Sequence, residues 1–359
     1  MKTLMNSFFA VSALTLTAAA NAQTAKPFLP LAPPVVSTIP SNGDVNPYGV
    51  FFVPRSIPTD GTLQPGDILV SNFNNSQNLQ GTGTTITRVD EAGNTSTFYQ
   101  GKPGLGLTAA LGVTRRGVVF VGNTPTTDGT SNTITAGSLL VLDRKGNGLV
   151  SLTDANLIQG PWGMAIHDDG DAAQVFFSNI LNGTVTRLDF VISANGESIG
   201  LTGAYTVASG FNHRTDPAAL VLGPSGLHYD AKNDILYIAS SLDNAVYSIT
   251  NAGSRANSAG TGTMIYQDNT HLHGPIDLVL APNGDMIVAN SDGSNVDPNQ
   301  PSELVEFTLE GKFVAQYSVD KNNGGAFGVG LTVIDGAVRF AAVDDNANTL
   351  NMWTVPVGK

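Results

Sequence analysis

The sequence contains no cysteine, which excludes disulfide bonds, thiolate metal sites and a lipid-modified N-terminal cysteine. Charged residues make up only 13% of the chain, and 17 lysines and arginines face 29 aspartates and glutamates. No basic cluster interrupts this acidic background, so neither nucleic acid nor an anionic membrane surface is expected as a partner. Helical periodicity is also missing after residue 22, whereas glycine is abundant, with 40 residues. This composition is typical of an all-β protein rich in turns.

An apolar run lies close to the N-terminus. It extends from Phe8 to Ala20, follows Lys2, and ends at an Ala-Asn-Ala site at residues 20–22. These features are typical of a secretory signal peptide, with cleavage expected after Ala22. The run is shorter than the roughly 20 apolar residues that span a bilayer. We therefore expect no membrane insertion after cleavage, and a mature protein that is periplasmic or extracellular.

A short pattern occurs six times in the rest of the chain. Its clearest copy reads HGPIDLVLAPNGDMIVAN, from His273 to Asn290, and holds an apolar strand, a Pro-Asn-Gly-Asp turn and a second apolar strand. The copies are 51 to 63 residues apart and begin at residues 46, 109, 160, 223, 274 and 325. This spacing is near that of four-stranded propeller blades. The sequence therefore predicts an all-β fold, a six-bladed β-propeller of four-stranded antiparallel blades, over residues 46–359.

The sixth repeat lacks a strand. After Gly328 to Val333, Val338 to Val343 and Leu350 to Val355 the sequence ends. A three-stranded blade would leave an open sheet edge in the ring. The N-terminal segment 23–45 holds a β-branched run, Val35 to Ile39, that has no hairpin partner nearby. We predict that this run forms the outermost strand of the last blade and closes the ring.

Polar residues recur where the second strand of each blade is expected to end. In a propeller the loops after the second strand and the connectors between blades lie on one face, around the mouth of the central channel. The asparagine side chains there either bind a polar ligand or a hard cation such as Ca²⁺, or each caps its own turn. The residues at this position are Asn72, Asn123, Asn179, Ser240, Asn290 and Val343, with Asp344 next to the last.

Apolar and aromatic residues precede the repeated glycine of the first strand in most blades. If they line the channel, its wall favours an organic ligand over a bare ion. The alternative is that they form the core between blades. These residues are Tyr48, Leu111, Trp162, Ser225, Ile276 and Phe327.

Three histidines fall in predicted connectors between blades. Residues i and i+2 of an extended segment point to the same side, so His271 and His273 could bind one metal ion, with His213 as a third ligand. Three histidines and a water are typical of a catalytic zinc site. The alternative is that these side chains are solvated or bonded to backbone carbonyls. Arg214, which follows His213, is a candidate catalytic residue.

Asp277 stands where four other repeats carry glycine. Burial near the channel entrance would raise its pKa and suit it for general-base catalysis. The alternative is an internal hydrogen bond to a neighbouring blade. A run rich in oxygen ligands for Ca²⁺, DGSNVDPNQ, begins at Asp292, although its spacing differs from that of an EF-hand. Other carboxylates expected on this face are Asp216, Asp297, Asp344 and Asp345.

The segments GPIDLVLAPNGDMIVAN and SELVEFTLEGKF resemble the blades of NHL-repeat propellers and, more loosely, those of gluconolactonase, the senescence-marker-like lactonases and strictosidine synthase. The resemblance covers residues 46–357 and implies a six-bladed propeller. It also implies a divalent cation held at the channel mouth by Glu, Asn and Asp, as in the lactonases. Asp277 matches that pattern, whereas Tyr48 and Gly49 stand where the glutamate is expected. Related amidating lyases use a zinc ion bound by histidine, for which this chain offers His213, His271 and His273.

Two functions are compatible with these features. The first is a non-catalytic propeller that binds a small organic molecule or a protein at the channel mouth, because repeat folds frequently serve as binding surfaces. The second is a metal-dependent hydrolase, lactonase-like, or a lyase of a small organic substrate, with Ca²⁺ or Zn²⁺ as the ion. Blade motifs specify a fold and not a reaction.

Overall fold

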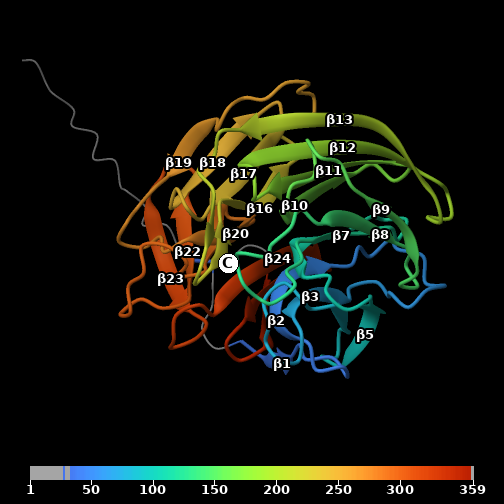
Figure 1. Cartoon of the computed structure of the whole chain (residues 1–359), viewed down its shortest axis with the longest axis horizontal. Helices are drawn as coiled ribbons and strands as arrows, with labels where there is room; N and C mark the ends of the chain where they lie inside the picture. The colour runs from blue at the N-terminus through green and yellow to red at the C-terminus, as the bar shows by residue number, and fades with distance from the viewer. Residues whose placement is uncertain (1–26, 29–32, 357–359) are drawn as a thin grey trace, which may run out of the picture.

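The computed structural model describes residues 27–28 and 33–356. Within these residues the chain forms six four-stranded antiparallel sheets, arranged as the blades of a ring, and a small hairpin (Figure 1). The predicted all-β, six-bladed propeller is confirmed. The predicted signal peptide, residues 1–22, lies outside the described residues. No helix in the described part of the chain has the length and hydropathy of a membrane span.

In the first five blades the strands follow one another in chain order from the channel outward. The first blade consists of β2 (Val45–Phe52), β3 (Ile68–Asn74), β4 (Thr85–Val89) and β5 (Thr95–Gln100). The second consists of β6 (Leu107–Val113), β7 (Val119–Asn123), β8 (Ser138–Leu142) and β9 (Gly148–Leu152). The third consists of β10 (Pro161–Asp168), β11 (Ala172–Asn179), β12 (Thr184–Ile192) and β13 (Ile199–Ser209).

The connector to the fourth blade carries the hairpin of β14 (Arg214–Asp216) and β15 (Leu220–Leu222). The fourth blade consists of β16 (Pro224–Asp230), β17 (Ile235–Ser240), β18 (Ala245–Thr250) and β19 (Thr263–Tyr266). The fifth consists of β20 (Pro275–Leu280), β21 (Asp285–Asn290), β22 (Glu303–Thr308) and β23 (Phe313–Ser318). The sixth consists of β24 (Ala326–Ile334), β25 (Ala337–Asp344), β26 (Thr349–Pro356) and β1 (Val35–Ser37).

The N-terminal strand closes the ring, as the missing strand of the sixth repeat predicted. β1 pairs antiparallel with β26, and Val36 lies opposite Leu350. The pairing extends to Thr38, whose N–H and hydroxyl both donate to the carbonyl oxygen of Asn348, at 3.0 and 2.9 Å. The strand is shorter than predicted because Pro40 has no N–H and restricts the backbone of Ile39.

A β-bulge interrupts the inner strand of every blade at the repeated glycine or its equivalent. The bulge leaves an N–H without a strand partner, and a serine of the next strand accepts it: Gly163 N–H donates to Ser178 Oγ at 2.9 Å. Ser178 then donates to the carbonyl oxygen of Ser225 in the following blade, at 2.6 Å. The first blade repeats this chain through Ser71. In the first and third blades the bulge therefore helps to join the blade to the next one.

Apolar side chains fill the spaces between neighbouring blades. Between the fifth and sixth blades the core includes Phe340, Trp353 and Phe28, which comes from the N-terminal segment. The Phe28 ring meets the Phe340 ring edge-on at 6.4 Å, and its backbone N–H donates to the buried Glu306 carboxylate at 2.9 Å. The N-terminal segment is therefore part of the core as well as of the last sheet.

Candidate functional site

Two cavities lie along the channel axis. We call the one at the loops after the second strands the upper cavity; it measures about 370 Å³. Its lining is Asn46, Tyr48, Gln80, Trp162, Ala218, Ala219, Val221, Leu222, Ser241, Ile276, Ser291, Asp292, Gly293, Val296, Gly324, Phe327, Asp345 and Asn346. The lower cavity measures about 310 Å³. Its lining is Val50, Phe51, Phe52, Pro54, Ala109, Leu111, Met164, Ala165, Leu227, Asp277, Leu278, Val279, Val329, Gly330, Leu331 and Thr332.

An aromatic layer forms the floor of the upper cavity. The Tyr48 ring lies 4.5 Å from the Phe327 ring and 5.8 Å from the Trp162 ring, centre to centre. Phe73 stacks on Tyr48 at 4.6 Å from behind. Tyr48 and Trp162 therefore line the channel and also pack as core residues, so both of the roles considered for them are observed. Rings at these separations attract one another beyond their burial, which favours a preformed floor.

The strand registers correct two alignments of the repeats. Leu111 pairs with Val121, at the position where Val50 pairs with Val70, so Ala109 and not Leu111 is the equivalent of Tyr48. The second blade was misaligned because its inner strand carries one extra residue in the bulge.

In the sixth blade Asp344, opposite Ala326, occupies the place that the sequence pattern gave to Val343. Val343 is fully buried. The run of alternating apolar residues in β25 therefore ends one residue later than expected.

The predicted asparagine ring lies inside the blades. Asn72 donates to Thr87 Oγ1 at 3.1 Å, and Asn123 donates to Ser138 Oγ at 2.6 Å. Asn179 donates to Thr186 Oγ1 within its own blade. Asn290 donates to the His271 carbonyl oxygen in the preceding connector. Among the described residues, none of these four asparagines lines the upper cavity. Their amides fix the ends of the second strands.

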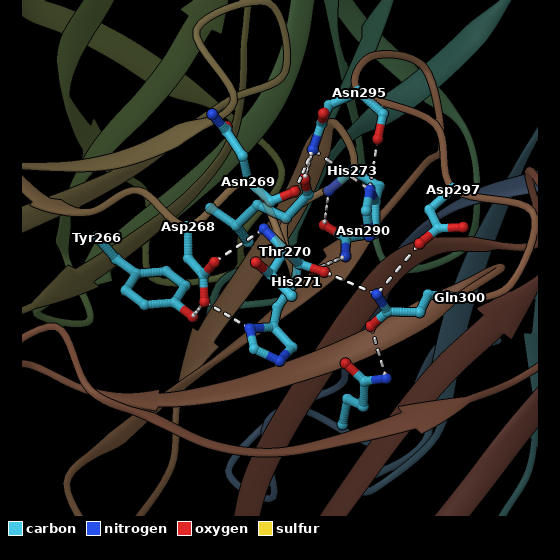
Figure 2. Close-up of polar contacts among 12 residues, drawn as sticks. Tyr266, Asp268, Asn269, Thr270, His271, His273, Asn290, Asn295, Asp297 and Gln300 are labelled. Atoms are coloured by element: carbon cyan, nitrogen blue, oxygen red, sulfur yellow. Dashed lines mark hydrogen bonds and ion pairs between the residues drawn. The ribbon is translucent and has the colours of Figure 1, made fainter.

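The three histidines of the predicted metal site have separate partners, and Figure 2 shows those of His271 and His273. His271 Nδ1 bonds the Asp268 carboxylate and its ring stacks on Phe313, whereas His273 Nδ1 donates to the Asn295 carbonyl oxygen. The connector is a turn, because the N–H of Leu272 donates to the Asp268 carbonyl oxygen at 2.8 Å. The rule for extended segments therefore does not apply to this pair.

His213 is exposed, and its Nδ1 atom lies 3.1 Å from the carbonyl oxygen of Phe211, two residues earlier in the chain. Within residues 27–28 and 33–356, no group of three or more His, Asp or Glu side chains is arranged to hold a metal ion. The structure therefore does not bring His213, His271 and His273 together as ligands. Arg214 is exposed as well and pairs with Asp216 at 3.1 Å, outside both cavities.

Asp277 lies below the aromatic floor, on the wall of the lower cavity, and not with the connector histidines. Its two carboxylate oxygens accept the N–H of Leu278 and, from the sixth blade, the N–H of Val329, both at 2.9 Å. The hydrogen bond to a neighbouring blade is thus observed. Burial raises the pKa of Asp277 to about 7, although the two hydrogen bonds act in the opposite direction and lower it.

Asp277 makes the stability of the protein depend on pH. In the unfolded chain its carboxyl ionises near 3.8, so between pH 4 and 7 the folded state retains a proton that the unfolded state has lost. The free energy of unfolding must then fall as the pH rises. From pH 5 to pH 8 we expect wild type to lose about 2–3 kcal/mol more than Asp277→Asn, measured by urea unfolding. The exposed Asp335→Asn should behave as wild type, and parallel pH profiles for wild type and Asp277→Asn would contradict the assignment.

Asp292 and Asp345 line the upper cavity. The sequence identified them only among several aspartates expected on this face. Asp292 accepts the N–H groups of Ser302 and Gly324 at 2.8 Å through one oxygen, and its other oxygen has no partner. Asp345 follows β25, and burial, with the neighbouring Asp344 charge, raises its pKa to about 8. No alternation pattern could distinguish Asp292 and Asp345 from the half-buried Asp297, because all three lie in loops.

Comparisons with known proteins support the fold. No protein-family model and no curated protein matches the sequence. Among solved structures, the chain is similar to an α-L-arabinofuranosidase of Fusarium graminearum in complex with an iminosugar inhibitor (TM-score 0.54, 11% identity, 90% of this chain and 97% of that chain). It is also similar to the Malassezia sympodialis allergen Mala s 1 (0.52, 12%, 90% and 96%) and to the calcium-binding protein regucalcin of Agrobacterium tumefaciens (0.51, 12%, 90% and 97%). Regucalcin belongs with the senescence-marker-like proteins, so that resemblance is supported at the level of fold, while the NHL family is not confirmed.

Proposed function

We propose that this is an exported binding protein that takes a small organic molecule into the upper cavity. The observation that carries the proposal is the cavity itself, which at about 370 Å³ falls in the size range of ligand pockets. It combines the apolar floor of Tyr48, Trp162 and Phe327 with polar groups on the rim. Such a combination binds the body of a ligand and orients its polar groups.

The rim is assembled from loops far apart in the sequence. Gln80 follows the second strand of the first blade, Ser241 that of the fourth and Ser291 that of the fifth, while Val221 comes from the hairpin connector. Loops on a rigid scaffold are where proteins usually place binding residues. The packed floor fixes the depth of the cavity, and the loops define its opening.

Filling the cavity tests this proposal. Ala219 lines the upper cavity, so Ala219→Trp should occupy part of its volume and weaken binding at least about tenfold. A library of soluble aromatic and aliphatic fragments, followed by ligand-observed NMR, provides the probes. Ala256→Trp, at an exposed position remote from both cavities, is the matched control. Equal fragment binding by wild type and Ala219→Trp, or none by wild type, would contradict the proposal.

A hydrolase or lyase that uses the lower cavity is the second candidate. The observation that favours it is Asp277, whose pKa of about 7 suits a general base at neutral pH. The apolar surroundings of Met164 and Leu227 would exclude water from the reacting atoms. Turnover of lactones or esters that disappears in Asp277→Asn and persists in Ala219→Trp would favour this candidate.

A further inference from the structure

The ionisable groups of the upper cavity that can carry charge near neutral pH are all carboxyl groups. Asp292 and Asp345 line it from the loops of the fifth and sixth blades, and no Lys, Arg or His among the described residues does. The other polar lining groups are neutral amides and hydroxyls. A ligand that enters this cavity therefore meets two carboxyl groups and no compensating cation.

Neither carboxyl group forms a salt bridge with a side chain in the described part of the chain. Asp345 is half-buried, and its carboxyl group has no hydrogen-bond or ion-pair partner among the described residues. Asp292 is 8% exposed, and its Oδ1 atom has no partner although Oδ2 accepts two backbone N–H groups. Burial raises the pKa of both carboxyls. Buried polar atoms are normally satisfied, so the unpaired Asp292 Oδ1 is available to a ligand, and so is the half-buried Asp345 carboxyl group.

The aromatic floor lies close to this charge. Tyr48 is 4% exposed, and after burial the Asp345 charge is the next cause that raises the pKa of its hydroxyl. Trp162 and Phe327 extend the aromatic surface beside it. The faces of aromatic rings attract cations, most strongly where water is excluded. Carboxyl groups on one side and aromatic rings on the other provide complementary surroundings for a positive group with an apolar body.

Other ligand classes fit these surroundings less well. A carboxylate or phosphate would be placed beside Asp292 and Asp345 without a basic partner, which costs free energy. A bare divalent cation requires several oxygen or nitrogen ligands in one group, and the described residues offer no such group of three or more His, Asp or Glu side chains. A neutral ligand would offer the two carboxyl groups no cationic partner.

From this geometry we infer that the upper cavity binds an organic ammonium ion, with its charge at Asp345 and Asp292 and its apolar body on the aromatic floor. The inference rests on the proposed binding function and adds the chemical class of the ligand. It makes Asp345 and Asp292 the residues that determine specificity.

Three probes of nearly equal size and different charge test the inference: phenethylammonium, 2-phenylethanol and phenylacetate. Each is titrated into the purified mature protein at pH 8 by isothermal titration calorimetry. We expect phenethylammonium to bind at least about tenfold more tightly than 2-phenylethanol, and phenylacetate to bind most weakly. Asp345→Asn should reduce the preference for the ammonium ion at least about fivefold, while its affinity for 2-phenylethanol stays within about twofold.

Asp335→Asn is the matched control, because the Asp335 side chain is 91% exposed and lies outside both cavities. Thermal melting of each variant checks that it is folded, and Asp292→Asn gives a second, independent variant. Equal or tighter binding of 2-phenylethanol or phenylacetate would overturn the inference while leaving the cavity as a binding site. An ammonium preference that survives both Asp345→Asn and Asp292→Asn would also overturn it. If none of the probes binds, the inference fails, and the fragment experiment decides separately on the proposed function.

Discussion

Deleting residues 23–39 is expected to lower the free energy of unfolding by at least about 5 kcal/mol. The deletion removes β1 from the edge of the sixth blade, so the outer edge of β26 loses its partner. The hydrogen bonds of Thr38 to Asn348 and of Met352 N–H to the Pro34 carbonyl oxygen are lost with it. An unpaired strand edge also favours association with other chains, so we expect the truncated protein to aggregate on heating.

Most of the expected loss comes from Phe28. The residue is 8% exposed in the core between the fifth and sixth blades, and removal of a buried phenylalanine side chain costs about 3–5 kcal/mol. Its N–H is also a hydrogen-bond donor to Glu306, a side chain with no exposed surface. Without this donor the carboxyl is buried with Asn283 Nδ2, at 3.1 Å, as its remaining side-chain donor, which adds a desolvation cost.

Point variants separate the two contributions. Phe28→Ala should reproduce the larger part of the loss in urea unfolding, whereas Val35→Ala should change stability by less than about 0.5 kcal/mol, because Val35 is 53% exposed. If the deletion and Phe28→Ala both unfold at the wild-type urea concentration, the N-terminal segment does not close the ring.

The blades could be predicted from the sequence because their determinants are local. Each repeat holds its own alternating apolar residues and its own turn, such as Pro282-Asn-Gly-Asp285 between β20 and β21. Even the closure followed from a count of strands, since the sixth repeat had three and Val35 to Ile39 had no neighbour to pair with. The one-residue insertion in β6 could not be found in this way, because a bulge changes register without a change in apolar character.

The site could be predicted only in part, because it depends on where side chains point. Tyr48 and Trp162 were identified from their place before the bulge glycine, and they do form the cavity floor. The sequence did not indicate that His271 and His273 have different partners, because that depends on the turn closed by the hydrogen bond from Leu272 N–H to the Asp268 carbonyl oxygen. Asp345 could not be singled out, since its environment is created by loops from several blades.

Replacing Gly328 by alanine is expected to destabilise the ring by at least about 4 kcal/mol, or to prevent folding. A Cβ atom on Gly328 would lie 1.7 Å from the carbonyl oxygen of Tyr48 and 3.3 Å from the Cα atom of Gly49. Both are backbone atoms of β2, so no side-chain rotation relieves the overlap. Either the first and sixth blades separate or β2 shifts, and in both cases the contact between the Tyr48 and Phe327 rings is disturbed.

The cost at Gly328 therefore measures how closely the first and last blades meet. Gly148→Ala is the matched control: a Cβ atom there meets no atom within 4 Å, and its stability should change by less than about 0.5 kcal/mol. Urea unfolding of both variants gives the difference. A Gly328→Ala protein with wild-type stability would contradict the close approach of β24 to β2, because it would mean that the two strands leave room for a methyl group. The aromatic floor, and the upper cavity above it, would then lose the contact that holds them together, because Tyr48 and Phe327 flank this junction.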